Sequence, residues 1–356
     1  MVLQLRARAD TGAPPGSTDY TTLVLLHGFV WHSGTFARLL PLATSYNARV
    51  ILVNRPGYPD APQYTDEECA LLKDVCALSD DPTTLADRHD KLLDFMKDRA
   101  REVYDFLGGL VIVGDVTPAD KAQNKGGIVV GGWSCGAAWI TALLAYMETF
   151  PIDAVDLSKH LRQVILHDPG MRVLGYPTDA VPDPYNPALL PFRPADDRAA
   201  DALFARWVTG YFAHGPTLDG YERRTPLARP APTIATISAA DLAAVCHAPA
   251  GDPATGADVH LFGAAVAAGV FRTVWERALA VGPRPAGGWG AAVGVRLVLC
   301  TRSAWEMPYA VDCVVRDVEA ARAEGRPVRD VEVVRVDGNH FVHWDRPEEA
   351  MRGLLA

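Results

Sequence analysis

One short segment of the 356-residue sequence has the pattern of a serine nucleophile. Residues 132–136 read Gly-Trp-Ser-Cys-Gly, after the apolar run Ile128–Val130 and before a helix-like run, Ala137–Glu148. A G-x-S-x-G pattern between a strand and a helix predicts a tight turn, in which the two glycines let the strand and the helix approach each other. The serine oxygen then stands at a helix N-terminus, whose dipole favours developing negative charge. We therefore expect Ser134 to act as a nucleophile.

A general base for this serine is expected near the end of the chain. Residues 338–344 read Gly-Asn-His-Phe-Val-His-Trp and follow the apolar run Val331–Val336. A histidine on a loop after the last strand can reach a nucleophile across the carboxyl ends of parallel strands. We take His340 as the base because it comes immediately after the turn, with His343 as the alternative.

Backbone donors for a developing oxyanion are expected in two places. An oxyanion hole needs two N–H groups aimed at one point. The residue after the nucleophile, Cys135, supplies one of them. The loop His27–Val30, directly after the apolar run Leu23–Leu26, supplies the other through Phe29. These groups predict nucleophilic acyl chemistry that needs neither a metal nor an organic cofactor.

The elements that must position these residues alternate between strands and helices. Near-continuous apolar runs are typical of parallel strands buried on both faces, and the runs here are Leu23–Leu26, Val50–Val53, Gly127–Val130, Val164–Leu166, Val295–Leu299 and Val331–Val336. The helix-like segments between and after them include Thr35–Ala43, Ala86–Leu107, Ala137–Glu148, Tyr309–Glu324 and Pro347–Leu355. This order predicts an α/β fold with a mainly parallel, doubly wound sheet.

The stretch from residue 171 to residue 294 interrupts this alternation. It contains Pro-rich segments and has no strong strand pattern, and its helix-like runs are Arg198–Ala213, Ala239–Cys246 and Val259–Leu279. We therefore predict a core of residues 1–170 and 295–356, with a mainly helical cap, residues 171–294, inserted between two strands. Large aromatic side chains in the cap are candidates to line a site or to form the cap's own core: Trp207, Tyr211, Phe212, Phe262, Phe271 and Trp275.

Composition and charge exclude several classes of function. The chain carries 34 Lys and Arg against 43 Asp and Glu, a net charge of −9, so we expect no nucleic-acid partner. No apolar run approaches the roughly 18 residues that a membrane span needs, and the N-terminus lacks the apolar core of a secretory signal. The six cysteines have no metal-ligand spacing, which predicts free thiols and a cytoplasmic protein.

Taken together, these segments resemble the α/β-hydrolase superfamily. The resemblance spans Leu23–Asp168 and residues 295–356. It rests on His-Gly at 27–28, Asn-Arg-Pro-Gly-Tyr at 54–58, the serine turn at 132–136 and the segment 339–349, which looks like the C-terminal histidine loop of esterase and epoxide-hydrolase-like members. A serine at the turn argues, by resemblance, against haloalkane dehalogenase or epoxide hydrolase chemistry, because those enzymes use an aspartate there.

The resemblance leaves two candidates for the acid that would orient the histidine. In most of the superfamily this acid follows the strand before the histidine strand, where the present sequence has Ser303 and Ala304, with Glu306 slightly later. An alternative acid position follows the strand after the nucleophile helix, and Asp168 stands there. We take Asp168 as the acid and Glu306 as the alternative, since either keeps the order serine, acid, histidine.

The resemblance implies a serine hydrolase that acts on a carboxylic ester or lactone. A roofed, aromatic-rich site suits a mid-sized apolar substrate, and we expect this site to be lined by Val30, Trp133, Trp207, Tyr211 and Trp305. The alternatives are C–C bond hydrolysis or acyl transfer by the same residues, and a non-catalytic ligand-binding protein of this fold. The sequence is also compatible with a homodimer.

Overall fold

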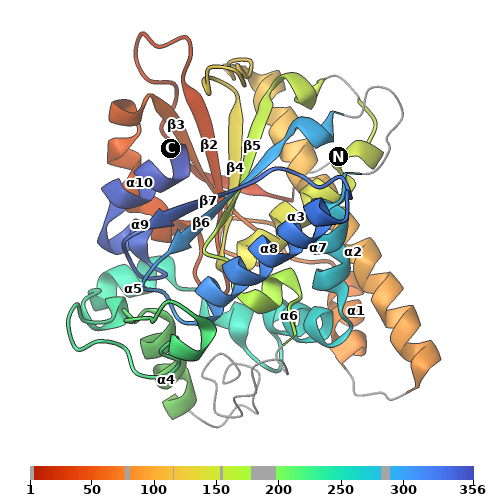
Figure 1. The fold of residues 1–356 in the computed structure, drawn as a ribbon, viewed down its shortest axis with the longest axis vertical. Coiled ribbons are helices and arrows are strands. Elements are labelled where there is room, and N and C mark those ends of the chain that lie inside the picture. Colours follow the sequence, from red (N-terminus) through yellow and green to blue (C-terminus); the bar gives the residue numbers. More distant parts are fainter. Residues whose placement is uncertain (1–3, 77–80, 115, 153–154, 178–197, 282–288) are drawn as a thin grey trace.

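A mainly parallel sheet forms the centre of the protein (Figure 1). The structure, a computed structural model, describes residues 4–76, 81–114, 116–152, 155–177, 198–281 and 289–356. Its seven strands are ordered β1–β3–β2–β4–β5–β6–β7, and only β1 runs antiparallel to its neighbour. The strands are β1 (Arg6–Asp10), β2 (Thr21–Leu26), β3 (Ala48–Asn54), β4 (Ile128–Trp133), β5 (Leu161–His167), β6 (Gly294–Cys300) and β7 (Val331–Val336).

The predicted parallel sheet is confirmed, and its buried strands explain why the apolar runs are nearly continuous. Every residue of β2 and β4 is buried, because helices cover both faces of the sheet. The sequence analysis did not predict β1, whose residues are mostly exposed and carry charged side chains at the sheet edge. A charged edge strand lacks the apolar pattern from which the other strands were predicted.

Helices lie on the two faces of the sheet (Figure 1). The 3-10 helix η1 (Ser33–Leu42) packs with α9 (Val342–Asp345) and α10 (Pro347–Leu355) on one face. On the other face lie α2 (Pro82–Val113), α3 (Ala137–Tyr146) and α8 (Glu306–Ala323), whereas α1 (Asp66–Cys76) packs against the helix Ala257–Ala267. Most predicted helices are present, although the predicted helix at 35–43 is a 3-10 helix.

The chain between β5 and β6 forms helices rather than strands in its described part. They are α4 (Arg198–Val208), α5 (Ala239–Val245), α6 (Ala257–Ala267) and α7 (Val270–Leu279). The single helix predicted over 259–279 is broken in two at Gly269, whose φ of 69° ends α6. The predicted helix at 198–213 ends at Val208, because the chain turns at Gly210, where a methyl group would strike Pro226.

This β5–β6 insertion lies at the carboxyl ends of the central strands. Trp31, after β2, forms an isolated β-bridge with Cys246, and the Phe212 N–H donates to the Arg302 carbonyl after β6. Within the described residues, no single helix is long and apolar enough to cross a membrane, and only the bent pair α6–α7 meets that criterion jointly.

Two glycines allow the chain to turn sharply from β4 into α3. β2 pairs with β3 on one side and with β4 on the other, so successive connections leave β2 in opposite directions along the sheet. At such a point the carboxyl ends of the two neighbouring strands flank a crevice. A Cβ atom on Gly132 would collide with the backbone of Gly136, and a Cβ on Gly136 would collide with the His27 carbonyl after β2. The glycines therefore let the turn and the β2 loop come into contact.

Replacing Gly136 by alanine should destabilise the fold. We expect Gly136→Ala to lower the free energy of unfolding by about 2–3 kcal/mol, because the methyl group overpacks the contact with the β2 loop. The matched control is Gly108→Ala in α2, where nothing lies within 4 Å of the new Cβ atom; it should be neutral or stabilising by about 0.5–1 kcal/mol. Urea unfolding measures both, and an equal effect of the two changes would contradict the close approach.

The last residue of β5 is a fully buried histidine. His167 has 0% exposure, and neither ring nitrogen has a hydrogen-bond partner among the described residues. Burial lowers its pKa from the ordinary value near 6.5 to about 4, although the negative charge of neighbouring Asp168 acts in the opposite direction. The folded protein therefore keeps this ring neutral at a pH where the unfolded chain protonates it.

This difference predicts a loss of stability on acidification. Below about pH 6.5 the unfolded state binds the proton and the folded state does not, so stability that is present at neutral pH is lost progressively down to about pH 4. The loss attributable to this group is about 3 kcal/mol. The His167→Leu variant should lack that part of the loss when unfolding is measured in urea at both pH values. An unchanged pH dependence would show that the imidazole does not titrate in this way.

Candidate active site

Ser134 lies at the turn between β4 and α3, where the short 3-10 helix η3 (Ser134–Gly136) begins. Its φ of 53° is in the left-handed region, which is strained for a residue with a side chain. The side chain is half-buried and lines a cavity. The turn thus presents the hydroxyl group at the start of a helix, where backbone N–H dipoles favour negative charge.

A buried histidine and a buried aspartate meet beside this turn. His340 Nδ1 lies 2.7 Å from Asp168 Oδ2, and the two residues are 1% and 0% exposed. Asp168 directly follows β5, and His340 lies in the loop after β7. With Nδ1 engaged by the carboxylate, Nε2 is the ring nitrogen left to exchange a proton.

The Asp168 carboxylate has further donors that fix its orientation. The Cys300 N–H donates to Oδ1 at 2.8 Å, and the Ser303 hydroxyl donates to Oδ2. Asp168 itself has a φ of 50°, a second left-handed residue at the end of a central strand. Ser303 stands near the position where the resemblance placed an acid, and its hydroxyl group here supports the carboxylate of Asp168 instead.

The loop that carries His340 is held against the serine turn by Trp133. The indole Nε1–H donates to the His340 carbonyl at 3.0 Å, and the two rings lie 4.9 Å apart. His340 and Ser134 both line the same cavity. The turn and the histidine loop are therefore joined directly, although Ser134 and His340 lie 206 positions apart in the sequence.

The two alternative candidates occupy different surroundings. Glu306, the first residue of α8, lines the cavity and forms an ion pair with Arg172, with 3.2 Å between Oε1 and Nη2. His343 is fully buried, and its Nε2 lies 3.1 Å from the Thr35 hydroxyl. Burial, together with neighbouring His167, holds the pKa of His343 far below its ordinary value. The carboxylate hydrogen-bonded to His340 is that of Asp168.

The loop after β2 packs directly on the serine turn. A Cβ atom on Gly28 would lie 3.0 Å from the Ser134 Cβ and 3.1 Å from the Trp133 ring, both tighter than ordinary van der Waals contacts, so glycine favours this close approach. Phe29 and Cys135 line the cavity together with Ser134. Burial and the negative charge of Asp258 raise the pKa of the Cys135 thiol to about 12, which keeps the thiol protonated and a poor nucleophile.

The cavity has a volume of about 300 Å³ and a predominantly apolar lining. The core and the β5–β6 insertion both contribute to it. Its walls include Phe29, Trp31, Trp133, Phe204, Trp207, Val208, Phe262, Val266, Met307 and Phe341. The Arg172–Glu306 pair is the charged part of this lining. A cavity of this size and polarity fits a small or mid-sized apolar group.

Only some of the residues predicted to contact substrate line this cavity. Trp133 and Trp207 do. Val30, Trp305 and Tyr211 do not: the Val30 N–H donates to Tyr58, Trp305 packs on Tyr309, and the Tyr211 hydroxyl donates to Asp345. Of the other cap aromatics considered, Phe262 lines the cavity, whereas Phe212, Phe271 and Trp275 are buried outside its lining.

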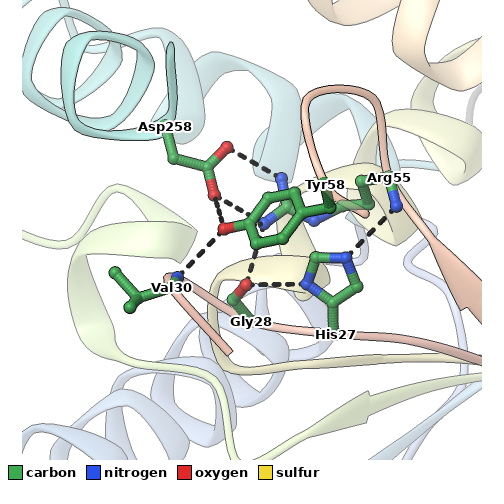
Figure 2. A network of polar contacts seen from close by, with 6 residues as sticks. All are labelled: His27, Gly28, Val30, Arg55, Tyr58 and Asp258. Atoms are coloured by element: carbon green, nitrogen blue, oxygen red, sulfur yellow. Dashed lines mark hydrogen bonds and ion pairs between the residues drawn. The ribbon is translucent and has the colours of Figure 1, made fainter. Parts of the chain in front are cut away.

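Sequence reasoning missed two sets of polar residues near the site. The first is Arg172, which closely follows the predicted acid. Arg55, Tyr58 and Asp258 form a buried polar group beside the β2 loop (Figure 2). Arg55 and Tyr58 lie in the segment that carried the resemblance, but nothing in the sequence pairs them with Asp258, about 200 residues away.

Among the residues that the structure describes, no group of three or more His, Cys, Asp or Glu side chains is arranged to hold a metal ion. Cys69, Cys135, Cys246, Cys300 and Cys313 are free thiols.

Comparison with known proteins gives the family. The family model described as "Alpha/beta hydrolase family" matches residues 23–352, and no curated protein matches the sequence. Similar solved structures include the N-acyl homoserine lactonase AidH in complex with N-butanoyl homoserine, with a TM-score of 0.52 and 12% identity over 98% of this chain and 90% of that one. A bromoperoxidase from Bacillus anthracis has a TM-score of 0.51 and 14% identity over 94% and 91% of the two chains. At these identities the structures show the fold, and the family match, which spans the core and the insertion, shows that the chain belongs to the alpha/beta hydrolase family.

Proposed function

We propose that the protein is a serine hydrolase that cleaves a carboxylic ester or lactone with a mid-sized apolar acyl group. The observation that carries this proposal is the 2.7 Å hydrogen bond between His340 Nδ1 and Asp168 Oδ2, next to a cavity that Ser134 and His340 both line. A nucleophile, a base and an acid that orients the base are the three parts of a triad. They come from the ends of β4, β7 and β5.

The chemistry follows from the roles of these groups. Ser134 Oγ attacks the acyl carbon while His340 Nε2 takes the hydroxyl proton, and Asp168 stabilises the imidazolium that forms. When the tetrahedral intermediate collapses, the C–O bond to the leaving group breaks and His340 returns the proton to the departing oxygen. A water molecule, deprotonated by His340, then attacks the acyl-enzyme, and the released Ser134 oxygen recovers a proton.

The negative oxygen of the intermediate needs donors that are already in place. We assign this role to the backbone N–H groups of Phe29 and Cys135, which lie in two chain segments in contact beside Ser134. Each such donor typically contributes about 3 kcal/mol to transition-state stabilisation. The donors are backbone groups, so the loop conformation, rather than side-chain chemistry, sets their direction.

In this proposal the chain has two domains: a core of residues 1–170 and 295–356, and a cap of residues 171–294. The β5–β6 insertion is this cap. Trp207 and Phe262 from the insertion belong to the apolar wall of the cavity that Ser134 also lines. Such a wall favours an acyl chain over a charged or polymeric substrate. The lactonase among the similar structures hydrolyses a bond of the same chemical class, which supports the inclusion of lactones.

Substitutions of the two candidate acids test the proposal. Asp168→Asn should lower kcat on p-nitrophenyl esters by a factor on the order of 10³–10⁴, because His340 loses the anion that orients its ring and stabilises the imidazolium. Glu306→Gln is the matched control and should keep kcat within about tenfold, because Glu306 pairs with Arg172 while the carboxylate on His340 is that of Asp168. Ser134→Ala should abolish turnover while far-UV circular dichroism stays unchanged. A larger loss for Glu306→Gln than for Asp168→Asn would contradict this assignment of the acid.

The size of the cavity predicts an acyl-chain preference that can be shifted. Gly263, on α6, lines the cavity, and a Cβ atom there meets nothing within 4 Å. Gly263→Leu should therefore fill part of the cavity and lower kcat/KM for p-nitrophenyl octanoate about tenfold or more, with little change for the acetate. Gly263→Ala is the control for the loss of glycine. A wild-type preference for the acetate, or equal losses on both esters, would contradict an acyl-binding cavity.

A further inference from the structure

A buried ion pair connects the β5–β6 insertion to the core next to the β2 loop (Figure 2). Asp258 lies in the first turn of α6, and Arg55 follows β3. Their side chains are 1% and 0% exposed. Arg55 Nη1 donates to Asp258 Oδ1 at 3.0 Å, and Nη2 donates to Oδ2 at 2.6 Å. This bidentate geometry fixes the two side chains relative to each other.

Arg55 also fixes the peptide group that carries the proposed oxyanion donor. Its Nη2 donates to the Gly28 carbonyl at 2.8 Å. The Arg55 N–H donates to His27 Nε2 at 3.2 Å, which leaves His27 Nδ1–H to donate to the same Gly28 carbonyl at 3.0 Å. The Gly28 carbonyl and the Phe29 N–H belong to one planar trans peptide, so holding the carbonyl sets the direction of the N–H.

Tyr58 holds the other side of Phe29. Its hydroxyl group donates to Asp258 Oδ2 at 2.5 Å and accepts the Val30 N–H at 2.9 Å. Burial, together with the charge of Asp258, raises the pKa of Tyr58 far above its ordinary value, so the hydroxyl keeps its single proton and gives it to the carboxylate. The oxygen lone pair is then available for the Val30 N–H.

The insertion contacts this loop at a strained residue. Val30 has a φ of 67°, a conformation that β-branched residues rarely adopt. Its carbonyl accepts the His247 N–H at 2.6 Å, while its N–H is held by Tyr58. A strained backbone persists where its surroundings overdetermine it. Here those surroundings include two segments of the insertion, around His247 and around Asp258.

We propose that Asp258 is a positioning residue for the active site: through Arg55 and Tyr58 it orients the Gly28–Phe29 peptide, so that docking of α6 on the core completes the oxyanion hole. This inference rests on the serine hydrolase proposed above. It assigns the insertion a part in the chemical step, in addition to its part in forming the cavity wall. Asp258 contributes no atom to the cavity lining, so it acts only through the loop.

Kinetics of Tyr58→Phe and Asp258→Asn test this inference. We expect kcat on the preferred p-nitrophenyl ester to fall about tenfold or more in each variant while KM stays within about twofold, because an oxyanion donor acts in the transition state. The control is Tyr221→Phe. The Tyr221 hydroxyl also joins the insertion to the core, by donating to Asp312 Oδ2 at 2.6 Å, but it lies outside the network in Figure 2. This variant should keep its kcat.

The affinity for a trifluoromethyl ketone distinguishes a positioning role of Asp258 from a purely structural role. Such a ketone adds the serine oxygen to form a negatively charged hemiketal, so its affinity should weaken in Tyr58→Phe in proportion to kcat/KM. In the double variant Tyr58→Phe/Asp258→Asn the losses should be less than multiplicative, because both changes act on one loop. If Asp258→Asn fails to fold, Tyr58→Phe alone decides the outcome.

The outcomes distinguish the two proposals. An active wild type whose Tyr58→Phe variant keeps its kcat and its ketone affinity would overturn the positioning role and leave the serine hydrolase intact. Losses of the same size in Tyr58→Phe and Tyr221→Phe would also overturn it. A folded wild type that hydrolyses no ester or lactone would overturn the proposed function, and the role of Asp258 with it.

Discussion

Three strained residues at the ends of neighbouring strands shape the candidate active site. Val30, Ser134 and Asp168 have φ values of 67°, 53° and 50°, and they follow β2, β4 and β5, which lie side by side. Each left-handed conformation costs about 1–3 kcal/mol for a residue with a side chain. In this site the strain coincides with the proposed oxyanion loop, nucleophile and acid. At each of these points the chain turns sharply at the end of its strand, and of the three residues Ser134 lines the cavity while Asp168 contacts His340.

Contacts with neighbouring residues hold these strained conformations in place, and several of the contacts come from the insertion. Gly132 and Gly136 permit the turn at Ser134, and the Cys300 N–H and Ser303 hydroxyl hold Asp168 from β6 and the loop after it. The β2 loop is held by the insertion itself. A buried ion pair such as Arg55–Asp258 adds little net stability because both ions lose their hydration. In the role proposed for Asp258, the pair acts instead by fixing the geometry of the loop.

The sequence predicted the parallel strands and the serine turn well, because buried strands and tight turns restrict residue type locally. Position in the strand order also indicated His340. The edge strand β1 carried no apolar pattern, and the break between α6 and α7 depended on a single glycine. The family resemblance indicated Asp168 as a partner for His340, whereas the contact of Asp258 with Arg55 joins residues 203 positions apart that nothing in the sequence connects. Such pairs follow from tertiary packing, which a single sequence does not encode in its local pattern.

The central claim is that His340 and Asp168 activate Ser134 as a nucleophile. The most direct measurement is the reaction of the folded protein with a fluorophosphonate, followed by peptide mass spectrometry. The account predicts one covalent adduct, on Ser134, which forms far more slowly in His340→Ala and Asp168→Asn and disappears in Ser134→Ala. An unmodified Ser134 in folded wild-type protein, or labelling that does not depend on His340 and Asp168, would contradict it.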